Sequence, residues 1–261
     1  MIGRIPLLVR MKRAGRLVGV LLAVGALAEP AMAQAGCRHA PRPGVDWSGC
    51  SKARLMLRNE DLTGAVLTGA LLTLSDFTGS NMVGAKLNET QVSRTRFEGA
   101  ILSRADFTKA IGWRVYFGQA VLEQAVFHSA DMNRSNFAQV KAAGATFNKA
   151  ELNRSDFSGA DLAGADLMKA ELVRAVFQNT GLTGVDFSYA NLSRANLNGA
   201  QLKGVNLTQS YLYLTRLSGA DLSGAVGLTQ AQIDIACGTT ETKLPTGLVQ
   251  PSSWPSAEEG N

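Results

Sequence analysis

The sequence has little of what most enzyme sites are built from. It contains two histidines and three cysteines, and aromatic residues make up 7% of it. His39 and His128 stand apart, and no phosphate-binding loop, nucleophile elbow or metal-spaced cluster occurs in the sequence. We therefore expect no enzyme activity: no catalytic residue, no cofactor and no metal site.

The sequence also lacks an apolar run of the length that a membrane-spanning helix needs. The run at residues 17–28 would extend about 18 Å as a helix, against about 30 Å of hydrocarbon. It follows a basic stretch ending at Arg16 and precedes Ala31-Met32-Ala33, a small-x-small pattern that signal peptidase accepts. We therefore expect a signal peptide cleaved after Ala33 and a periplasmic or secreted protein without a transmembrane segment.

The three cysteines are Cys37, Cys50 and Cys237. Cys37 and Cys50 lie in the same N-terminal stretch, and export to an oxidising compartment permits a disulfide between them. Cys237 should be free or pair between chains. An alternative is that residues 34–37, Gln-Ala-Gly-Cys, act as a lipoprotein box, although such a box usually begins with an apolar residue. Cys37 would then carry a lipid anchor.

The net charge of +5 belongs mostly to the N-terminus. Five of the 26 basic residues and one of the 21 acidic residues lie in residues 1–33. The 21 basic and 20 acidic side chains that remain nearly cancel. The charge therefore gives no reason to expect a nucleic-acid partner.

A period of five residues runs through residues 57–222. Of the 34 positions in this phase, all but Gly112 and Ala142 are Leu, Phe, Met or Val. Two residues before each large one, all 33 positions in residues 65–225 are Ala, Ser, Thr or Val. An α-helix forms no stripe with this period, and a flat strand would put successive large residues on opposite faces. A chain that turns a corner every five residues points both the small and the large residue inward.

Three units show the repeat clearly: residues 160–164, 165–169 and 220–224 read Ala-Asp-Leu-Ala-Gly, Ala-Asp-Leu-Met-Lys and Ala-Asp-Leu-Ser-Gly. They resemble the A(D/N)LXX motif of pentapeptide-repeat proteins. The resemblance covers residues 45–226, about 70% of the chain. It implies an all-β fold, a right-handed quadrilateral β-helix or β-solenoid with four pentapeptides per coil.

The sequence offers its own test of four units per coil, because residues 20 apart should then stack. Two sets of phenylalanines recur at this spacing, ten residues out of step and therefore on opposite walls: Phe77, Phe97, Phe117, Phe137, Phe157 and Phe177, and Phe107, Phe127, Phe147 and Phe187. The other two walls hold Leu or Met almost throughout. Aromatic opposite aromatic and aliphatic opposite aliphatic fills the interior at constant volume.

The ends of such a stack need covers, because an open coil is an edge prone to aggregation. Trp47 and the Cys37–Cys50 loop are the N-terminal candidates. At the other end, Thr229 and Gln232 read as a capping box that opens a short helix, and Gly238 is placed to end it. The predicted organisation is a signal peptide at 1–33, a linker or cap at 34–44, the solenoid at 45–226, a capping helix at 227–238 and an irregular tail at 239–261.

Six arginines recur every 20 residues and should stack along one edge: Arg94, Arg114, Arg134, Arg154, Arg174 and Arg194. Three of them have an acidic residue three positions earlier, namely Asp131, Glu151 and Glu171. One interpretation is a self-neutralised ladder that favours solubility and register. The other is a stripe that binds an anionic polymer or an acidic protein.

Outward aromatic residues form a second surface feature. Trp113 and Tyr116 flank a unit in which Gly112 replaces the large core residue, and Tyr211 and Tyr213 follow near the C-terminal end. A missing core side chain indicates a bulge, a groove or a contact patch, and exposed aromatics are typical of contact surfaces. Decayed repeats without a function would give the same pattern.

The resemblance also suggests a function, because the best-understood relatives mimic DNA, bind DNA gyrase and confer quinolone resistance. That mechanism needs a strongly acidic rod in the cytoplasm. Residues 57–226 contain 16 basic and 15 acidic residues, and an export signal precedes them. We therefore expect a protein-interaction or structural scaffold whose partner is a protein or an anionic polymer. Gyrase binding and a lipid-anchored envelope protein are the alternatives, and a homodimer is compatible with either.

Overall fold

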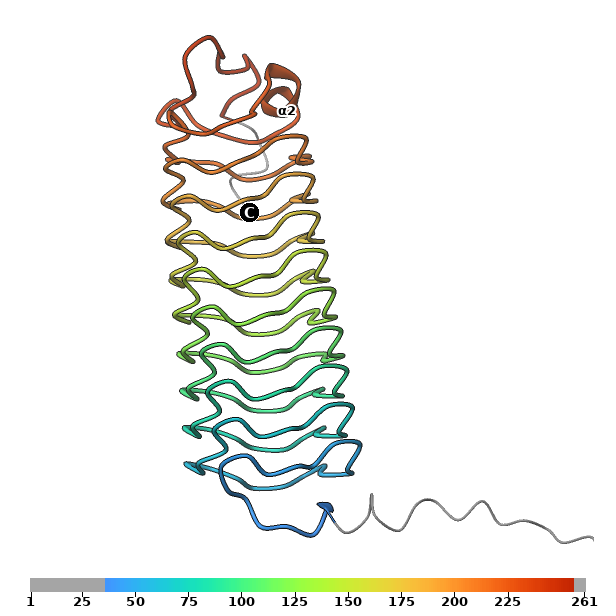
Figure 1. Ribbon diagram of the computed structural model, residues 1–261. Coiled ribbons are helices and arrows are strands. Elements are labelled where there is room, and N and C mark those ends of the chain that lie inside the picture. Colours follow the sequence, from blue (N-terminus) through green and yellow to red (C-terminus); the bar gives the residue numbers. More distant parts are fainter. Residues whose placement is uncertain (1–35, 256–261) are drawn as a thin grey trace, which may run out of the picture.

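Each five-residue unit of the chain forms one side of a coil. The computed structural model describes residues 36–255, and Figure 1 shows them as a tall stack of such coils. In most units the amide of the small residue donates to the carbonyl of the large residue three positions earlier, as from Ala65 to Leu62 at 2.9 Å. The residue before the small one, here Gly64, has a positive φ, as a type II β-turn requires.

Parallel bridges join successive coils. From Asp46 with Val66 to Asn206 with Val226 they connect residues 20 apart, so four five-residue units make one coil. All of these bridges are isolated, and the described residues contain no extended strand. The turn occupies most of each unit, which leaves one bridging residue per side. The all-β prediction therefore takes the form of a bridge ladder rather than a sheet of long strands.

The interior consists of the large and small residues of every unit, nearly all of them buried. Phenylalanine rings within one column stack at centroid distances of 4.7–5.3 Å and interplanar angles of 3–13°. Rings of the opposite column meet them edge to face at 5.6–5.9 Å. Both geometries are favourable for aromatic pairs. The two phenylalanine columns therefore face each other across the interior, as the sequence predicts.

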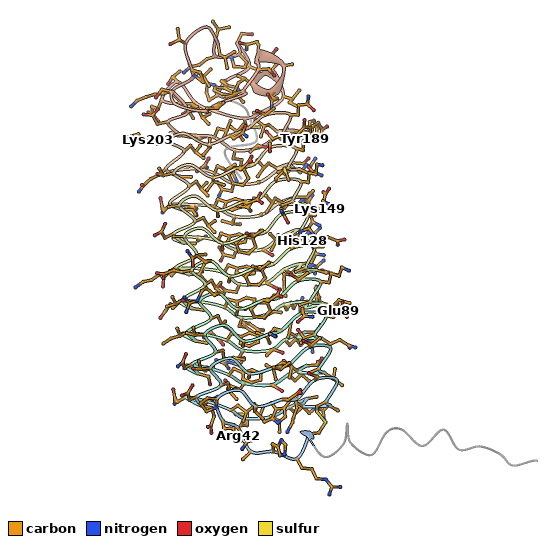
Figure 2. The ribbon with its side chains drawn as sticks, viewed as in Figure 1. Arg42, Glu89, His128, Lys149, Tyr189 and Lys203 are labelled. Carbon is orange, nitrogen blue, oxygen red and sulfur yellow. A yellow bond between two sulfur atoms is a disulfide. The ribbon has the colours of Figure 1, made fainter. Side chains whose placement is uncertain are left out.

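The other two walls carry the surfaces discussed below. The arginine wall is the one whose inward positions run every 20 residues from Leu72 to Leu212. The glycine wall lies opposite, with inward positions from Leu62 to Leu222. Side chains that recur at multiples of 20 residues project from one side of the stack, as those of Glu89, Lys149 and Tyr189 do, whereas Lys203 projects from the other (Figure 2).

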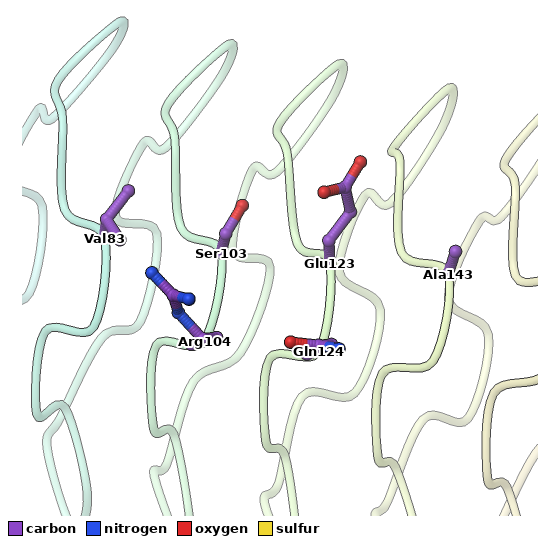
Figure 3. Close-up of a pocket in the computed structure, with 6 residues that line it drawn as sticks. All are labelled: Val83, Ser103, Arg104, Glu123, Gln124 and Ala143. Carbon is purple, nitrogen blue, oxygen red and sulfur yellow. The ribbon is translucent and has the colours of Figure 1, made fainter.

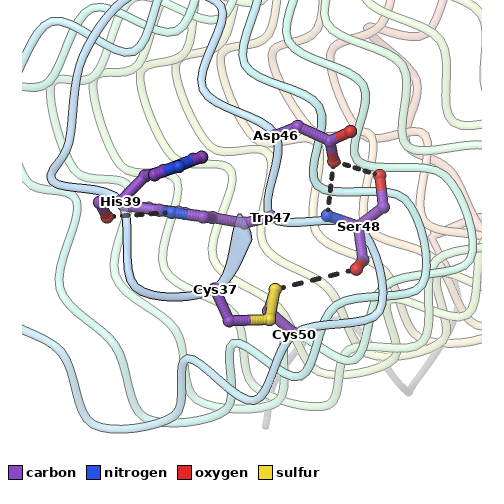
Figure 4. Close-up of a disulfide and its surroundings, with 6 residues drawn as sticks. All are labelled: Cys37, His39, Asp46, Trp47, Ser48 and Cys50. Carbon is purple, nitrogen blue, oxygen red and sulfur yellow. Dashed lines mark hydrogen bonds between the residues drawn. A yellow bond between two sulfur atoms is a disulfide. The ribbon is translucent and has the colours of Figure 1, made fainter. Parts of the chain in front are cut away.

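The N-terminal end is covered by a short disulfide-bonded loop (Figure 4). Cys37 and Cys50 are joined, with their Cα atoms 5.5 Å apart, as predicted. Trp47 is buried beneath the loop, and its indole N–H donates to the carbonyl of His39 at 3.2 Å. The ammonium of Lys52 lies 4.0 Å from the centre of the Trp47 ring, and burial lowers the pKa of Lys52. The Trp47 ring and the Lys52 ammonium thus cover the N-terminal end of the first coil. The signal peptide expected at 1–33 lies outside the described residues.

The C-terminal end is covered by helix α2, Gln230–Asp234. Thr229 is its N-cap and forms the predicted capping box with Gln232. The side-chain amide of Gln232 also donates to the carbonyls of Leu207 at 2.8 Å and Ser210 at 2.9 Å. These bonds satisfy acceptors of the coil below α2, a role that the sequence pattern did not reveal.

The tail continues this cover without forming a helix or a strand. Lys243 bridges with Asp221, and Trp254 donates to the carbonyl of Ala236 at 3.0 Å. The prediction that Gly238 ends the helix is wrong, because α2 ends at Asp234. Gly238 instead leaves room for Trp254, whose ring would lie 2.5 Å from an added Cβ. Nearby, Cys237 is a free and buried thiol, a position that does not favour the alternative of pairing between chains.

Candidate binding surface

The six arginines form a continuous column along one edge of the arginine wall. All six are exposed, and each occupies the third position of its turn with φ between 56° and 60°. Residues with a Cβ pay about 1 kcal/mol or more in this left-handed region, whereas glycine does not. The column therefore carries a conformational cost at every coil from Arg94 to Arg194.

Within residues 36–255, none of the six arginines forms an ion pair. The ion pairs in that part of the chain join Arg58 to Asp76, Arg96 to Glu98 and Lys243 to Asp221. Six guanidinium groups thus stand in line without a carboxylate partner. This arrangement favours the interpretation of a binding stripe over that of a self-neutralised ladder.

The acidic residues of the same wall are held by amides instead. The side-chain amide of Asn133 donates to Asp131 at 2.7 Å and to Glu151 at 3.2 Å. That of Asn191 donates to Glu171 at 2.9 Å. In each of these three carboxylates the other oxygen has no partner among the described residues. The role of Asn133 was not predicted, although the five-residue phase places it outward between the acidic and arginine columns. Asn191 instead continues the acidic column, one coil after Glu171.

Trp113 lies beside the arginine column, one position before Arg114, and its ring is close to three of the arginines. Its ring centre is 5.5 Å from the guanidinium carbon of Arg94, 4.1 Å from that of Arg114 and 5.8 Å from that of Arg134. Its backbone N–H donates to the hydroxyl of Ser93 on the preceding coil at 3.2 Å. The side chain is 37% exposed, so a polarised aromatic surface is presented to solvent among three cations.

Gly112 leaves no groove behind Trp113. An added Cβ there would lie 2.5 Å from a methyl of Val115, 2.6 Å from one of Val92 and 3.0 Å from the sulfur of Met132. These side chains fill the space that the missing residue would occupy. The expectation of a groove at Gly112 is therefore wrong. The ladder continues there, since Gly112 still donates to the carbonyl of Asp131 at 2.7 Å.

The other outward aromatics fall in two places. Tyr211 and Tyr213 lie together at the C-terminal end of the arginine wall, with nearly parallel rings 6.2 Å apart. They are 52% and 43% exposed. Tyr116 instead belongs to the neighbouring phenylalanine wall, where it bridges with Arg96 and Asn136. The structure therefore places Trp113, Tyr211 and Tyr213 on the arginine wall and Tyr116 on the neighbouring wall.

The remaining surface of the described residues has hollows but no cluster of metal-binding side chains. An open depression of about 510 Å³ lies on the glycine wall (Figure 3). It is lined by Val83, Ser103, Arg104, Glu123, Gln124 and Ala143. Over residues 36–255, no group of three or more His, Cys, Asp or Glu side chains is arranged to hold a metal ion. In the same part of the chain, no helix has the length and apolar character to cross a membrane.

Comparison with known proteins identifies the repeated region. The family model described as a pentapeptide repeat region matches residues 130–207. The model described as pentapeptide repeats (8 copies) matches residues 61–91, 100–139 and 190–226. Together they match more than half of the chain, all of it within the coils. No curated protein matches the sequence.

Several solved structures are similar to the chain. HetL of Nostoc sp. strain PCC 7120, a pentapeptide repeat protein involved in heterocyst differentiation regulation, is 22% identical; the match covers 77% of this chain and 92% of HetL, with a TM-score of 0.30. A pentapeptide repeat protein of the Arabidopsis thaliana thylakoid lumen is 29% identical, over 40% of this chain and 74% of that one, with a TM-score of 0.37. QnrB1, a plasmid-mediated fluoroquinolone resistance protein, is 20% identical, over 75% and 89%, with a TM-score of 0.38.

Proposed function

Because this chain belongs to the pentapeptide-repeat family, we propose that it is a non-catalytic scaffold that binds an anionic partner along its arginine wall. The observation that carries this proposal is the column of six exposed arginines without an ion pair among the described residues. Desolvating such charges is favourable only when an anion replaces the lost water. Charge complementarity of this kind selects partners and speeds their association.

The proposal includes the form of the rod and its location. Family membership implies a right-handed quadrilateral β-helix, and the 20-residue bridge spacing supports four sides. The signal peptide predicted at 1–33 supports export to the periplasm or beyond. The Cys37–Cys50 disulfide supports an oxidising compartment. It also favours release over a lipid anchor, because the sulfur of Cys37 cannot at once form a disulfide and a lipid thioether.

Gyrase binding by DNA mimicry is the less favoured alternative. A DNA mimic needs a surface dominated by carboxylates, and the coils have nearly equal numbers of basic and acidic residues. The most regular charged feature of this rod is cationic. Protection of gyrase supercoiling activity from a quinolone at a low protein concentration would support the alternative and contradict our proposal.

The proposal is tested by neutralising arginines that do not contact Trp113. We expect the variant R154Q/R174Q/R194Q to lose partners that the wild-type protein retains after crosslinking in fractionated cells. The matched control is R104Q/K141Q/K203Q, which removes three exposed positive charges from the opposite wall. An identical set of crosslinked partners for both variants would show that the arginine column is not the contact surface.

A further inference from the structure

We propose that the partner of the arginine wall is an extended acidic polysaccharide that carries one carboxylate per sugar, lies along the rod, and places its carboxylates on the arginines and its hydroxyls on the acidic column. This inference rests on the proposed function and names the chemical class of the partner. It follows from the way the wall is divided lengthwise into a cationic edge, a polar and aromatic middle, and an edge of hydrogen-bond acceptors.

The cationic edge favours a single linear chain of negative charges. Successive arginines differ by one coil, a spacing of about 4.8 Å set by the bridge ladder. The column runs over six coils and ends at Leu74 on one side and Leu214 on the other, which hold the same turn position. Guanidinium groups bind carboxylates through paired hydrogen bonds, so each coil offers one site for one carboxylate.

The acceptor edge favours a ligand with hydroxyl groups. Asp131, Glu151 and Glu171 stand three residues before arginines of the same coils, at most about 10 Å away along the backbone. Each has a carboxylate oxygen without a partner among the described residues. Such an oxygen accepts a hydrogen bond from a hydroxyl but repels a phosphate or a second carboxylate. A sugar with its carboxylate on one edge and hydroxyls on the other matches this wall.

The middle of the wall offers surfaces for the faces of sugar rings. Trp113 is exposed among three arginines, and Tyr211 and Tyr213 are exposed at the far end. The side-chain amide of Asn153 has no hydrogen-bond partner among the described residues, while its oxygen accepts from the amide of Val173 at 3.0 Å. It is therefore a fixed donor between the two charged edges. Aromatic platforms at two points, separated by two amides, a valine and a serine, suit a chain of linked rings.

A nucleic acid fits the wall less well. Double-stranded DNA has two phosphate backbones, and the wall has a single file of cations. A single strand would place its bases over the middle, where binding proteins use aromatic side chains for successive bases. From Arg134 to Arg194 the wall has no aromatic residue in the middle column, and its acidic edge faces the place of the strand.

The direct test uses polygalacturonate, an unbranched polymer with one carboxylate per sugar, and the mature wild-type protein. Of the three tryptophans, Trp47 and Trp254 are buried, so a change of fluorescence on binding reports Trp113. We expect the fluorescence change to saturate as polymer is added. The affinity should fall as the salt concentration is raised. The variant R154Q/R174Q/R194Q should bind at least about tenfold more weakly, and R104Q/K141Q/K203Q should bind like the wild type.

Further binding measurements distinguish the chemical classes of ligand. Fully methyl-esterified polygalacturonate should not bind, because it has no carboxylates. Asn153→Leu and Trp113→Ala leave all charges in place, and each should weaken binding of the polysaccharide. Because Trp113→Ala removes the fluorescent reporter, its affinity is measured by calorimetry. Equal binding of the esterified polymer, or tighter binding of polyphosphate or a single-stranded oligonucleotide, would overturn the polysaccharide assignment. If no polymer binds but a crosslinked partner still depends on the arginines, this inference fails and the proposed function stands.

Discussion

The arginine wall and the glycine wall lie opposite each other and use the same turn, but they fill its third position differently. On the glycine wall this position is glycine in most coils, with φ between 64° and 69° at Gly64, Gly84, Gly144, Gly164, Gly184 and Gly204. On the arginine wall it is arginine in six successive coils, with φ between 56° and 60°. The fold accepts glycine at this position and gains stability from it. The arginines are therefore not a requirement of the backbone, and a role at the surface explains them better.

The two walls also differ in the continuity of their ladders. Bridges on the arginine wall run without a break from Ser51 to Tyr211. On the glycine wall, in the described residues, no bridge joins Gln201 to Asp221, and Lys243 from the tail pairs with Asp221 instead. The wall that we propose as a binding surface thus has the more regular backbone. An even spacing of arginines depends on that regularity.

The largest effect is expected from restoring the missing core residue on the arginine wall. Gly112→Leu should lower the free energy of unfolding by about 3 kcal/mol, because Val92, Val115 and Met132 already fill the space. Leucine is the usual residue in this phase, so a comparison of repeats alone would predict stabilisation. Urea unfolding measures the change. Val92→Ala in the same chain should recover part of the loss, and a more stable Gly112→Leu protein would show that the space is vacant.

Exchanging arginine and glycine at the third turn position should change the free energy of unfolding by a smaller amount. The sign of the change should be opposite for the two walls. We expect R154G/R174G to raise the free energy of unfolding by about 1 kcal/mol per site, because the left-handed turn position disfavours a Cβ. G164R/G184R should lower it by a similar amount, since an added Cβ at either glycine meets no atom within 4 Å and only the backbone conformation changes. Urea unfolding of both variants tests this. Equal stability of the two would remove the argument that arginine carries a cost here.

Repetition made the fold predictable from the sequence. The five-residue phase predicted which residues are buried, and the 20-residue recurrence of phenylalanine predicted two facing columns. Both predictions depend on local spacing, which a sequence displays directly. The capping box at Thr229 was predicted for the same reason, since its two residues are three positions apart.

The details that the sequence did not predict depend on contacts between distant residues. Gly238 was assigned to the end of a helix, but its neighbour is Trp254 from the tail. The acidic residues were placed near the arginines, but the geometry gives them to Asn133 and Asn191. The residue spacing placed the acidic residues, the arginines and the asparagines on one wall. It did not decide which of their side chains form hydrogen bonds with one another. The candidate site was therefore located by the sequence, and its chemistry came from the structure.

The break in the glycine wall should be visible as faster local exchange. Within residues 36–255, the amides of Leu202, Gly204 and Asp221 lack the ladder partners that Leu192 and Arg194 have on the arginine wall, at 2.9 and 2.8 Å. A ladder hydrogen bond contributes about 1 kcal/mol, so these amides should exchange about fivefold faster than those of the arginine wall. Hydrogen exchange followed by NMR or mass spectrometry measures this. Equal protection would mean that the two ladders close equally well in solution.

The smallest effect concerns Asp221, which ties the glycine wall to the tail. The hydroxyl of Ser223, the ammonium of Lys243 and the amide of Ser223 lower the pKa of Asp221 to about 2. The unfolded chain has a pKa of about 3.9, so the stabilisation is fully present above that value and is lost as the pH falls towards 2. Because the pair is exposed, the loss should be small.

Melting temperatures of the wild type and Asp221→Asn, measured from pH 7 to pH 2, test this contribution. The variant should melt slightly lower at pH 7, and the difference should close by pH 2, where the wild-type carboxyl is itself becoming protonated. Lys243→Gln is the matched control, since it keeps the bonds from Ser223 and should lose less. A difference between wild type and Asp221→Asn that stays constant with pH would show that the loss comes from packing and not from the charge of Asp221.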